Sequence, residues 1–173
     1  MASASRLCFQ PLDENTLEEA IRLVSAFFNV DGLLPDQINA VKAFFSGNDI
    51  YFSAPTGFGK SLIFQCLPMI ADILNNDVIG TCKALVICPL KALMLDQVEK
   101  LRKHTAITAA AIYDGQEERI LQEIENGDYS IVYASPESVL GNERWRKQLT
   151  TSSYFRENCK LLVIDEAHCI VHW

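Results

Sequence analysis

Eight consecutive residues, Ala54-Pro55-Thr56-Gly57-Phe58-Gly59-Lys60-Ser61, have the types and spacing of a loop that binds a chain of phosphates. Glycines allow consecutive backbone N–H groups to converge on phosphate oxygens. Lys60 adds a mobile positive charge for the outer phosphates, and the Ser61 hydroxyl is a ligand that Mg²⁺ accepts. Ala54 stands where the usual pattern has its first glycine. We assign nucleotide binding to Thr56, Gly57, Phe58, Gly59, Lys60 and Ser61.

The residues on either side of this loop predict how it is held. An apolar run at 49–53 precedes it and another at 62–64 follows it, which indicates a strand, a glycine-rich turn and a helix start. Such a helix points the positive end of its dipole at the bound phosphates.

A second group of chemically capable residues follows the apolar run 161–164. These are Asp165-Glu166-Ala167-His168. Two adjacent carboxylates at the end of a buried strand are costly unless a cation is present, and a magnesium-bound nucleotide supplies one. We expect Asp165 to bind the metal, and Glu166 to orient and deprotonate the attacking water. His168 is placed to hydrogen-bond a neighbouring motif and couple it to the nucleotide state.

The elements between these two groups alternate in type. Apolar runs predict strands, and helical periodicity predicts the helices between them. The expected strands are 84–88, 107–112, 129–134 and 161–164, and the expected helices are 90–104, 116–125 and a stretch from Pro136. Upstream, one helix is expected near Thr16, which has capping-box spacing with Glu19, and another from Pro35. This alternation predicts an α/β fold with a mostly parallel sheet flanked by helices.

Composition limits the class of protein. The chain has 173 residues, 49% of them hydrophobic, and a net charge of −7, which fits a globular domain and not a general nucleic-acid-binding surface. Basic clusters at 100–104 and 144–147 fit solvated helix faces or local contacts. The six cysteines form no C-x-x-C pair and predict reduced thiols. Without an apolar leader or a stretch long enough to cross a bilayer, the chain is expected to be intracellular.

Several stretches together resemble the first RecA-like lobe of a superfamily-two helicase, specifically of the RecQ family of DNA helicases. The resemblance runs from Leu33 to Trp173. It rests on the phosphate loop and on Leu33-Leu34-Pro35-Asp36-Gln37, Pro89-Leu90-Lys91-Ala92-Leu93-Met94-Leu95-Asp96-Gln97-Val98, Tyr133-Ala134-Ser135-Pro136-Glu137 and Asp165-Glu166-Ala167-His168-Cys169-Ile170 with Trp173. It implies a RecA-like P-loop NTPase lobe at 33–173, preceded by a helical extension at 1–32.

The resemblance also implies partners and further roles. ATP and Mg²⁺ are the expected cofactors, and DNA, single-stranded or at duplex junctions, is the expected partner of a nuclear 3′ to 5′ helicase. Gln37 is expected to hydrogen-bond adenine, Ser135 and Pro136 to touch the DNA backbone, and Trp173 to stack on single-stranded bases.

The chain departs from the family pattern at several positions. Leu33 and Leu34 replace an aromatic residue and an arginine, and Cys88 replaces a serine or threonine. Val171 and His172 replace a polar pair before the tryptophan.

The resemblance implies more protein than these 173 residues. The resemblance implies a further strand downstream, and beyond it a second RecA-like lobe that carries an arginine finger. The first lobe is therefore expected to be incomplete at its C-terminus. The chain is expected to be a fragment or a truncated product. Alone, it is expected to unwind little DNA and to hydrolyse ATP feebly. Three alternatives stay open: a nucleotide-binding interaction module without motor activity, an RNA-directed DEAH-box helicase, and another P-loop enzyme such as a small-molecule kinase.

Overall fold

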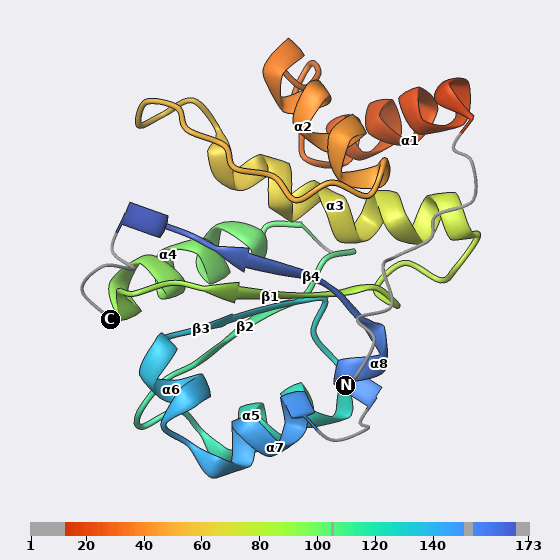
Figure 1. The fold of residues 1–173 in the computed structure, drawn as a ribbon. Coiled ribbons are helices and arrows are strands. Elements are labelled where there is room, and N and C mark those ends of the chain that lie inside the picture. Colours follow the sequence, from red (N-terminus) through yellow and green to blue (C-terminus); the bar gives the residue numbers. More distant parts are fainter. Residues whose placement is uncertain (1–12, 105, 151–153, 169–173) are drawn as a thin grey trace. The chain divides into compact units, whose positions relative to one another are not determined.

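The structure is a computed structural model that describes residues 13–104, 106–150 and 154–168 (Figure 1). Its internal contacts divide the chain into two compact units, Met1–Asp77 and Val78–Trp173. We call them the N-terminal unit and the C-terminal unit and describe each by itself.

Three helices make up the described part of the N-terminal unit. They are α1 (Glu14–Phe27), α2 (Pro35–Phe45) and α3 (Lys60–Asn75). Both α1 and α2 pack against α3. Every residue of α3 from Ile63 to Asp72 is buried, as expected for a helix that is apolar on nearly all sides. The helix that begins at Lys60 is therefore the central element of this unit, which gives the phosphate loop a rigid base.

The start of α1 differs from the prediction. Asp13, not Thr16, is its N-cap: the Asp13 carboxylate accepts hydrogen bonds from the Thr16 backbone N–H at 3.0 Å and the Thr16 hydroxyl at 2.7 Å. The predicted capping box of Thr16 with Glu19 is therefore wrong. An aspartate one turn earlier satisfies the free N–H groups of the first turn, and Thr16 becomes part of the helix.

The predicted strand at 49–53 is also wrong. The chain from Asn48 to Pro55 has no regular secondary structure, and the Tyr51 side chain is 86% exposed. A strand forms only where a neighbouring strand accepts and donates its backbone hydrogen bonds, and all four described strands belong to the C-terminal unit.

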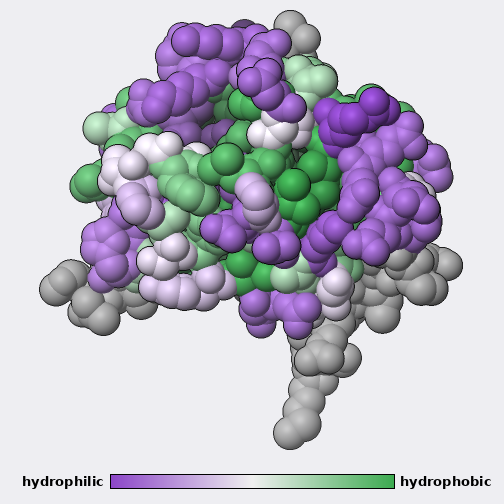
Figure 2. Space-filling view, turned by 90° about the horizontal axis from the view of Figure 1, so that it is seen from above, coloured by the Kyte–Doolittle hydropathy of each residue, from purple (hydrophilic) through white to green (hydrophobic). Residues whose placement is uncertain are grey.

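On the face seen in Figure 2, hydrophobic surface gathers near the middle and hydrophilic surface surrounds it.

The C-terminal unit contains a four-stranded sheet in the order β2-β3-β1-β4. Its strands are β1 (Lys83–Ile87), β2 (Ala109–Ile112), β3 (Ile131–Ala134) and β4 (Cys159–Ile164). All three pairs are parallel, which confirms the α/β prediction. Consecutive strands are joined through helices, as parallel pairing requires.

Helices cover both faces of this sheet (Figure 1). Helix α4 (Lys91–Leu101) lies on one face. The other helices are α5 (Glu118–Asn126), α6 (Pro136–Leu140), α7 (Glu143–Thr150) and α8 (Tyr154–Asn158). On their side of the sheet, alternate strand residues pack against buried residues of these helices. The strand residues are Leu85, Ala110, Ile112, Val132 and Ala134, and the helix residues are Ile124, Val139, Trp145 and Phe155.

The four strands end together. Ile87 pairs with both Ala134 and Ile164, and Ile112 pairs with Ala134. The residues that follow, Cys88, Tyr113, Ser135 and Asp165, consequently lie along one edge of the sheet, which we call the carboxyl edge. Ligand sites of parallel α/β proteins lie outside this end of the strands.

Strand β4 is less buried than the sequence predicted. It pairs with β1 and with no other described strand. Leu162 is 65% exposed and Ile164 is 43% exposed, because these apolar side chains lie on a strand with a neighbour on one side only.

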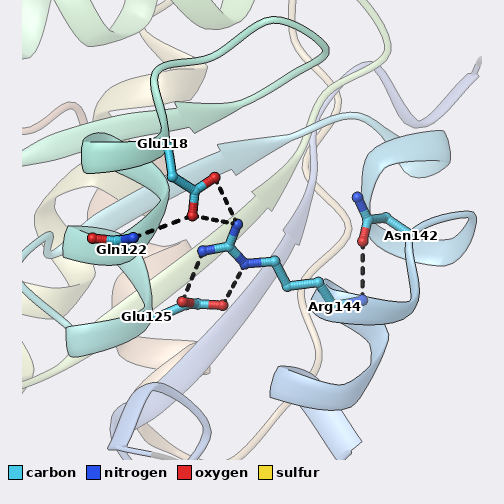
Figure 3. Close-up of polar contacts among 5 residues, drawn as sticks. All are labelled: Glu118, Gln122, Glu125, Asn142 and Arg144. Atoms are coloured by element: carbon cyan, nitrogen blue, oxygen red, sulfur yellow. Dashed lines mark hydrogen bonds and ion pairs between the residues drawn. The ribbon is translucent and has the colours of Figure 1, made fainter.

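An ion cluster joins α5 to α7 (Figure 3). Arg144 donates two hydrogen bonds to the Glu125 carboxylate, from Nε at 2.6 Å and from an Nη at 2.9 Å, and it also contacts Glu118 at 2.9 Å. The Asn142 side chain accepts the Arg144 backbone N–H at 2.9 Å. Hydrogen bonding from Arg144 holds the pKa of Glu125 below its ordinary value. Arg144 therefore fastens two helices, which fits a structural role for this basic residue.

The four described cysteines are free thiols, as predicted. Burial raises the pKa of the Cys66 thiol to about 12 and also raises the pKa of Cys159. None of the helices within the described ranges is long and apolar enough to cross a membrane.

Candidate functional site

The phosphate loop has the backbone that its glycines predict. Gly57 and Gly59 have φ angles of 86° and 84°, in the left-handed region that residues with a Cβ adopt at a cost. The Phe58 N–H donates to the Pro55 carbonyl at 3.3 Å, and Gly59 is the N-cap of α3. The loop therefore turns tightly into the N-terminus of a 16-residue helix, where N–H groups lack partners within the helix and favour an anion.

Lys60 lies folded over its own loop. Its ammonium Nζ donates to the Ala54 carbonyl at 2.7 Å and to the Pro55 carbonyl at 3.1 Å. Ser61 follows in the first turn of α3 and is half-buried. Phosphate oxygens would take the place of these two carbonyls as partners of the lysine.

Gln37 lies against the same loop. Its side-chain nitrogen Nε2 donates to the Phe58 carbonyl at 3.1 Å and to the Gly59 carbonyl at 3.2 Å, and its Oε1 accepts the Leu34 N–H at 2.8 Å. The side chain belongs to α2 and is only 3% exposed. The sequence predicted a residue that reads adenine. The structure places its amide on the phosphate loop.

An open cleft lies beside the loop within the N-terminal unit. It has a volume of about 540 Å³, and its lining includes Asp36 and Asn39 of α2 together with Tyr51, Phe52 and Phe58. Asp36 directly precedes Gln37 and Asn39 lies two residues after it, yet Gln37 turns to the loop instead of the cleft.

Asp165 and Glu166 lie at the carboxyl edge of the other unit. The Asp165 N–H donates to the Ile87 carbonyl at 2.9 Å, and the Asp165 carboxylate accepts the Glu166 N–H at 3.0 Å. Glu166 has a φ of 53°, unusual for a residue with a side chain. Left-handed backbone costs about 1 kcal/mol here and often marks functional positions. The chain therefore turns sharply at the residue predicted to be the catalytic carboxylate.

His168 contacts its own motif. Its Nδ1 lies 3.2 Å from a carboxylate oxygen of Glu166, and its side chain is 74% exposed. The role of His168 in coupling to another motif stays a prediction, and this contact gives it a route to Glu166.

The predicted DNA contacts are placed in part. Ser135 is the N-cap of α6, and its Oγ accepts the Ser138 N–H at 3.2 Å. Pro136 is buried, whereas Ser135 is half-buried and Glu137 is exposed, so this turn presents a hydroxyl and a carboxylate at the surface. Trp173 and the residues Val171 and His172 lie outside the described residues.

A pair of residues at the same edge was not predicted from the sequence. The Lys91 ammonium lies 3.8 Å from the centroid of the Tyr113 ring, a cation–π contact. Lys91 opens α4 after β1 and Tyr113 follows β2, on the far side of β3. Only the tertiary fold brings these two residues together, so no local pattern could have revealed them.

The basic clusters noted in the sequence are largely paired. Lys100 lies 2.6 Å from Asp96 on α4, and Arg102, the C-cap of α4, lies 3.0 Å from Glu99; all four side chains are exposed. Such pairs fit solvated helix faces.

Comparison with known proteins identifies the family of the chain. A family model described as DEAD/DEAH box helicase matches residues 34–173. The chain is 33% identical over 159 residues to the ATP-dependent helicase SGS1 of Saccharomyces cerevisiae, covering 90% of this chain and 11% of that protein. It is 30% identical to the ATP-dependent DNA helicase RecQ of Synechocystis, covering 93% of this chain and 31% of that protein.

A solved structure shares the fold. The DUF1998 helicase MrfA, crystallised with DNA and AMPPNP, superposes with a TM-score of 0.72 at 24% identity, covering 92% of this chain and 22% of that one. The chain thus spans 31% or less of the length of these proteins. Its parallel sheet is that of a helicase RecA-like lobe, its curated relatives are RecQ-family helicases, and the chain belongs to the DEAD/DEAH box helicase family.

Proposed function

We propose that this chain is the ATP-binding lobe of a RecQ-like DNA helicase that moves 3′ to 5′ and couples ATP hydrolysis to strand separation. The observation that carries the proposal is the loop of Gly57 and Gly59, which ends at the N-terminus of α3 with Lys60 folded across it. Family membership agrees with it.

The residues fit a magnesium-bound nucleoside triphosphate. In the N-terminal unit, the amides of 56–59 and the Lys60 ammonium would hold the phosphates, and the Ser61 hydroxyl offers a hard oxygen ligand of the kind that Mg²⁺ prefers. In the C-terminal unit, the Asp165 carboxylate offers an oxygen ligand of the same kind. When bound, the metal neutralises charge on the phosphates during transfer. Glu166 would accept a proton from the attacking water, and His168, in contact with Glu166, would respond to that change of charge.

DNA is the proposed partner of the carboxyl edge. Ser135 offers a hydroxyl there, and the Lys91–Tyr113 pair offers a cation beside an aromatic ring. Proteins that bind single strands without sequence preference combine these two features. Trp173 is proposed to add a second ring.

Unwinding is proposed for a longer protein, located in the nucleus, with a second RecA-like lobe that supplies an arginine finger. Loss of an arginine finger alone lowers turnover about 10³- to 10⁵-fold. We therefore propose that the chain by itself binds nucleotide but hydrolyses it slowly.

The test is nucleotide binding by the whole chain. Equilibrium dialysis with MgATP is expected to give saturable binding that Lys60→Ala weakens at least tenfold, because the variant removes a charge-assisted contact. Lys100→Ala, a loss of the same side chain from an exposed pair on α4, is the matched control and should leave affinity unchanged. Equal affinity of the native chain and Lys60→Ala would contradict the proposal.

A further inference from the structure

The turn between β2 and α5 is closed by the side-chain amide of Gln116. Its Nε2 donates to the carbonyl of Ala111 in β2 at 2.9 Å, and its Oε1 accepts the N–H of Glu117, the N-cap of α5, at 3.0 Å. The Gln116 backbone N–H also donates to the Tyr113 carbonyl at 3.1 Å. A carbonyl only accepts and an N–H only donates, so these partners fix which end of the amide is oxygen. Residues 113–116 are thereby held as a compact turn at the carboxyl edge.

The same amide oxygen holds the side chain of Tyr113. The Tyr113 hydroxyl donates to Oε1 of Gln116 at 3.1 Å. A carbonyl oxygen has two lone pairs, so Oε1 can accept both the hydroxyl and the Glu117 N–H. Because a tyrosine side chain has only two rotatable torsions, a bond at the far end of the ring restricts both of them. The orientation of the ring is therefore set by a residue three positions later in the sequence.

Lys91 meets this ring from a different segment. It is the first residue of α4, which packs against β2, and its ammonium lies 3.8 Å from the centroid of the Tyr113 ring. A cation is attracted to the face of an aromatic ring, so the contact exists only while that face is turned to Lys91. Lys91 is exposed and Tyr113 is half-buried. Gln116 thus holds the hydroxyl end of the ring while Lys91 lies over its face.

We propose that Gln116 is a positioning residue for the contact with single-stranded DNA, which acts by holding the Tyr113 ring in the orientation that meets Lys91 and a base. A ring that is held before the base arrives loses less conformational freedom on binding than a ring that must first be ordered. Gln116 needs no contact with the nucleotide. The proposal deepens the proposed DNA contact and rests on it for its binding arm.

Oligothymidylate binding by the whole chain is the first measurement, made by fluorescence anisotropy at low salt. Gln116→Ala is expected to weaken binding about fivefold, in the range for one side chain that must be ordered on binding. Gln122→Ala removes the same amide from an exposed position of α5 and should leave the affinity unchanged. Equal affinities of the native chain and Gln116→Ala would overturn the proposal.

A double variant distinguishes positioning from a general effect on the fold. In Tyr113→Ala the ring is gone and nothing is left to position, so adding Gln116→Ala should weaken binding no further. Residues that act independently have effects that add. A second loss of about fivefold in the double variant would therefore show that Gln116 does not act through Tyr113.

A measurement without DNA separates this inference from the proposed function. The ring current of Tyr113 should shift the ε protons of Lys91 upfield in the NMR spectrum, and the signal is assigned by its loss in Lys91→Arg. Gln116→Ala should move this signal toward that of a free lysine, and Gln122→Ala should not. If the native chain binds no oligothymidylate, the proposed DNA contact fails, and the Lys91 signal still decides whether Gln116 positions the ring.

Tyr113→Phe keeps the test decisive if Gln116→Ala does not fold. It removes the hydroxyl alone and leaves the bonds of Gln116 to Ala111 and Glu117 in place. It should also weaken oligothymidylate binding and move the Lys91 signal in the same direction. An unchanged Lys91 signal in Tyr113→Phe, or in a folded Gln116→Ala, would overturn the inference.

Discussion

Gly57 and Gly59 show how two residues with the same backbone can depend on glycine to different degrees. Their φ angles are 86° and 84°. A Cβ on Gly57 would meet no atom within 4 Å, whereas a Cβ on Gly59 would lie 2.8 Å from Nε2 of Gln37. Substitution at the first position carries the cost of left-handed backbone alone, and at the second it also displaces the amide that supports the turn.

This difference predicts unequal effects of alanine. Gly57→Ala should lower the unfolding free energy by about 1 kcal/mol, the cost of a side chain in the left-handed region, which lowers Tm by about 2–4 °C. Gly59→Ala should lower Tm further and weaken MgATP binding more. Thermal unfolding monitored by circular dichroism checks the first expectation, and dialysis checks the second. Equal shifts for the two variants would mean that the contact with Gln37 contributes nothing.

At this scale the sequence specified which residues form the loop but not what supports it. Gly57, Gly59 and Lys60 follow from local spacing, because a phosphate loop is built from consecutive residues. The partners of Gln37 lie 21 and 22 residues away, and only folding brings them together. The left-handed turn at Glu166 likewise had no local signal, since glutamate does not favour it.

Helices α5 and α7 depend on Arg144 for their polar contact. The guanidinium meets Glu125 through two short hydrogen bonds, and the side chains are 31% and 22% exposed. Bidentate pairs of this kind are stronger than ordinary surface pairs.

The pKa of Glu125 gives this contact a defined pH dependence. Arg144 lowers the pKa of Glu125 from its ordinary value of 4.5, so the stabilisation is fully present above that value and is lost as pH falls through the lower pKa of the folded state. Arg144→Met should lower the free energy of unfolding by about 1 kcal/mol near pH 7, and the difference from the native chain should shrink below pH 4.5.

Urea unfolding at a series of pH values measures this difference. Arg119→Met is the control, because Arg119 is 78% exposed and its pair with Glu123 spans 3.4 Å. It should change stability by less than about 0.5 kcal/mol at any pH. If the difference in unfolding free energy between the native chain and Arg144→Met did not change with pH, the stabilisation would not come from the ion pair with Glu125.

Element types were predictable where a local pattern and a tertiary partner agreed. The strands near Ala84, Ile131 and Leu161 were confirmed because each has a neighbouring strand in the sheet. The run at 49–53 has the same apolar character, but no strand lies beside it among the described residues of the N-terminal unit. Periodicity reports which residues suit a strand, and the partner that completes its hydrogen bonds is a property of the fold.

The net charge of the whole molecule shapes how it would meet DNA. A charge of −7 repels a polyanion at long range, and Lys100 of α4 and its C-cap Arg102 are already paired with acidic neighbours. Attraction must therefore come from local groups, such as Lys91 beside Tyr113, rather than from bulk charge.

Tyr113→Ala should consequently weaken binding to single-stranded oligothymidylate about tenfold, the range expected for loss of one stacking ring. Fluorescence anisotropy at low salt measures the affinity. Tyr51→Ala, which removes an 86% exposed ring from the other unit, is the control. Equal affinities of the two variants would exclude Tyr113 from the DNA contact.

The internal bonds of Lys60 change what a binding experiment on this protein should look like. The Lys60 ammonium donates to the Ala54 and Pro55 carbonyls, so contact with a phosphate would exchange one set of charge-assisted bonds for another. The heat released is the difference between the two sets and is expected to be small. Titration calorimetry is then a poor detector for this loop, and methods that count bound ligand directly suit it better.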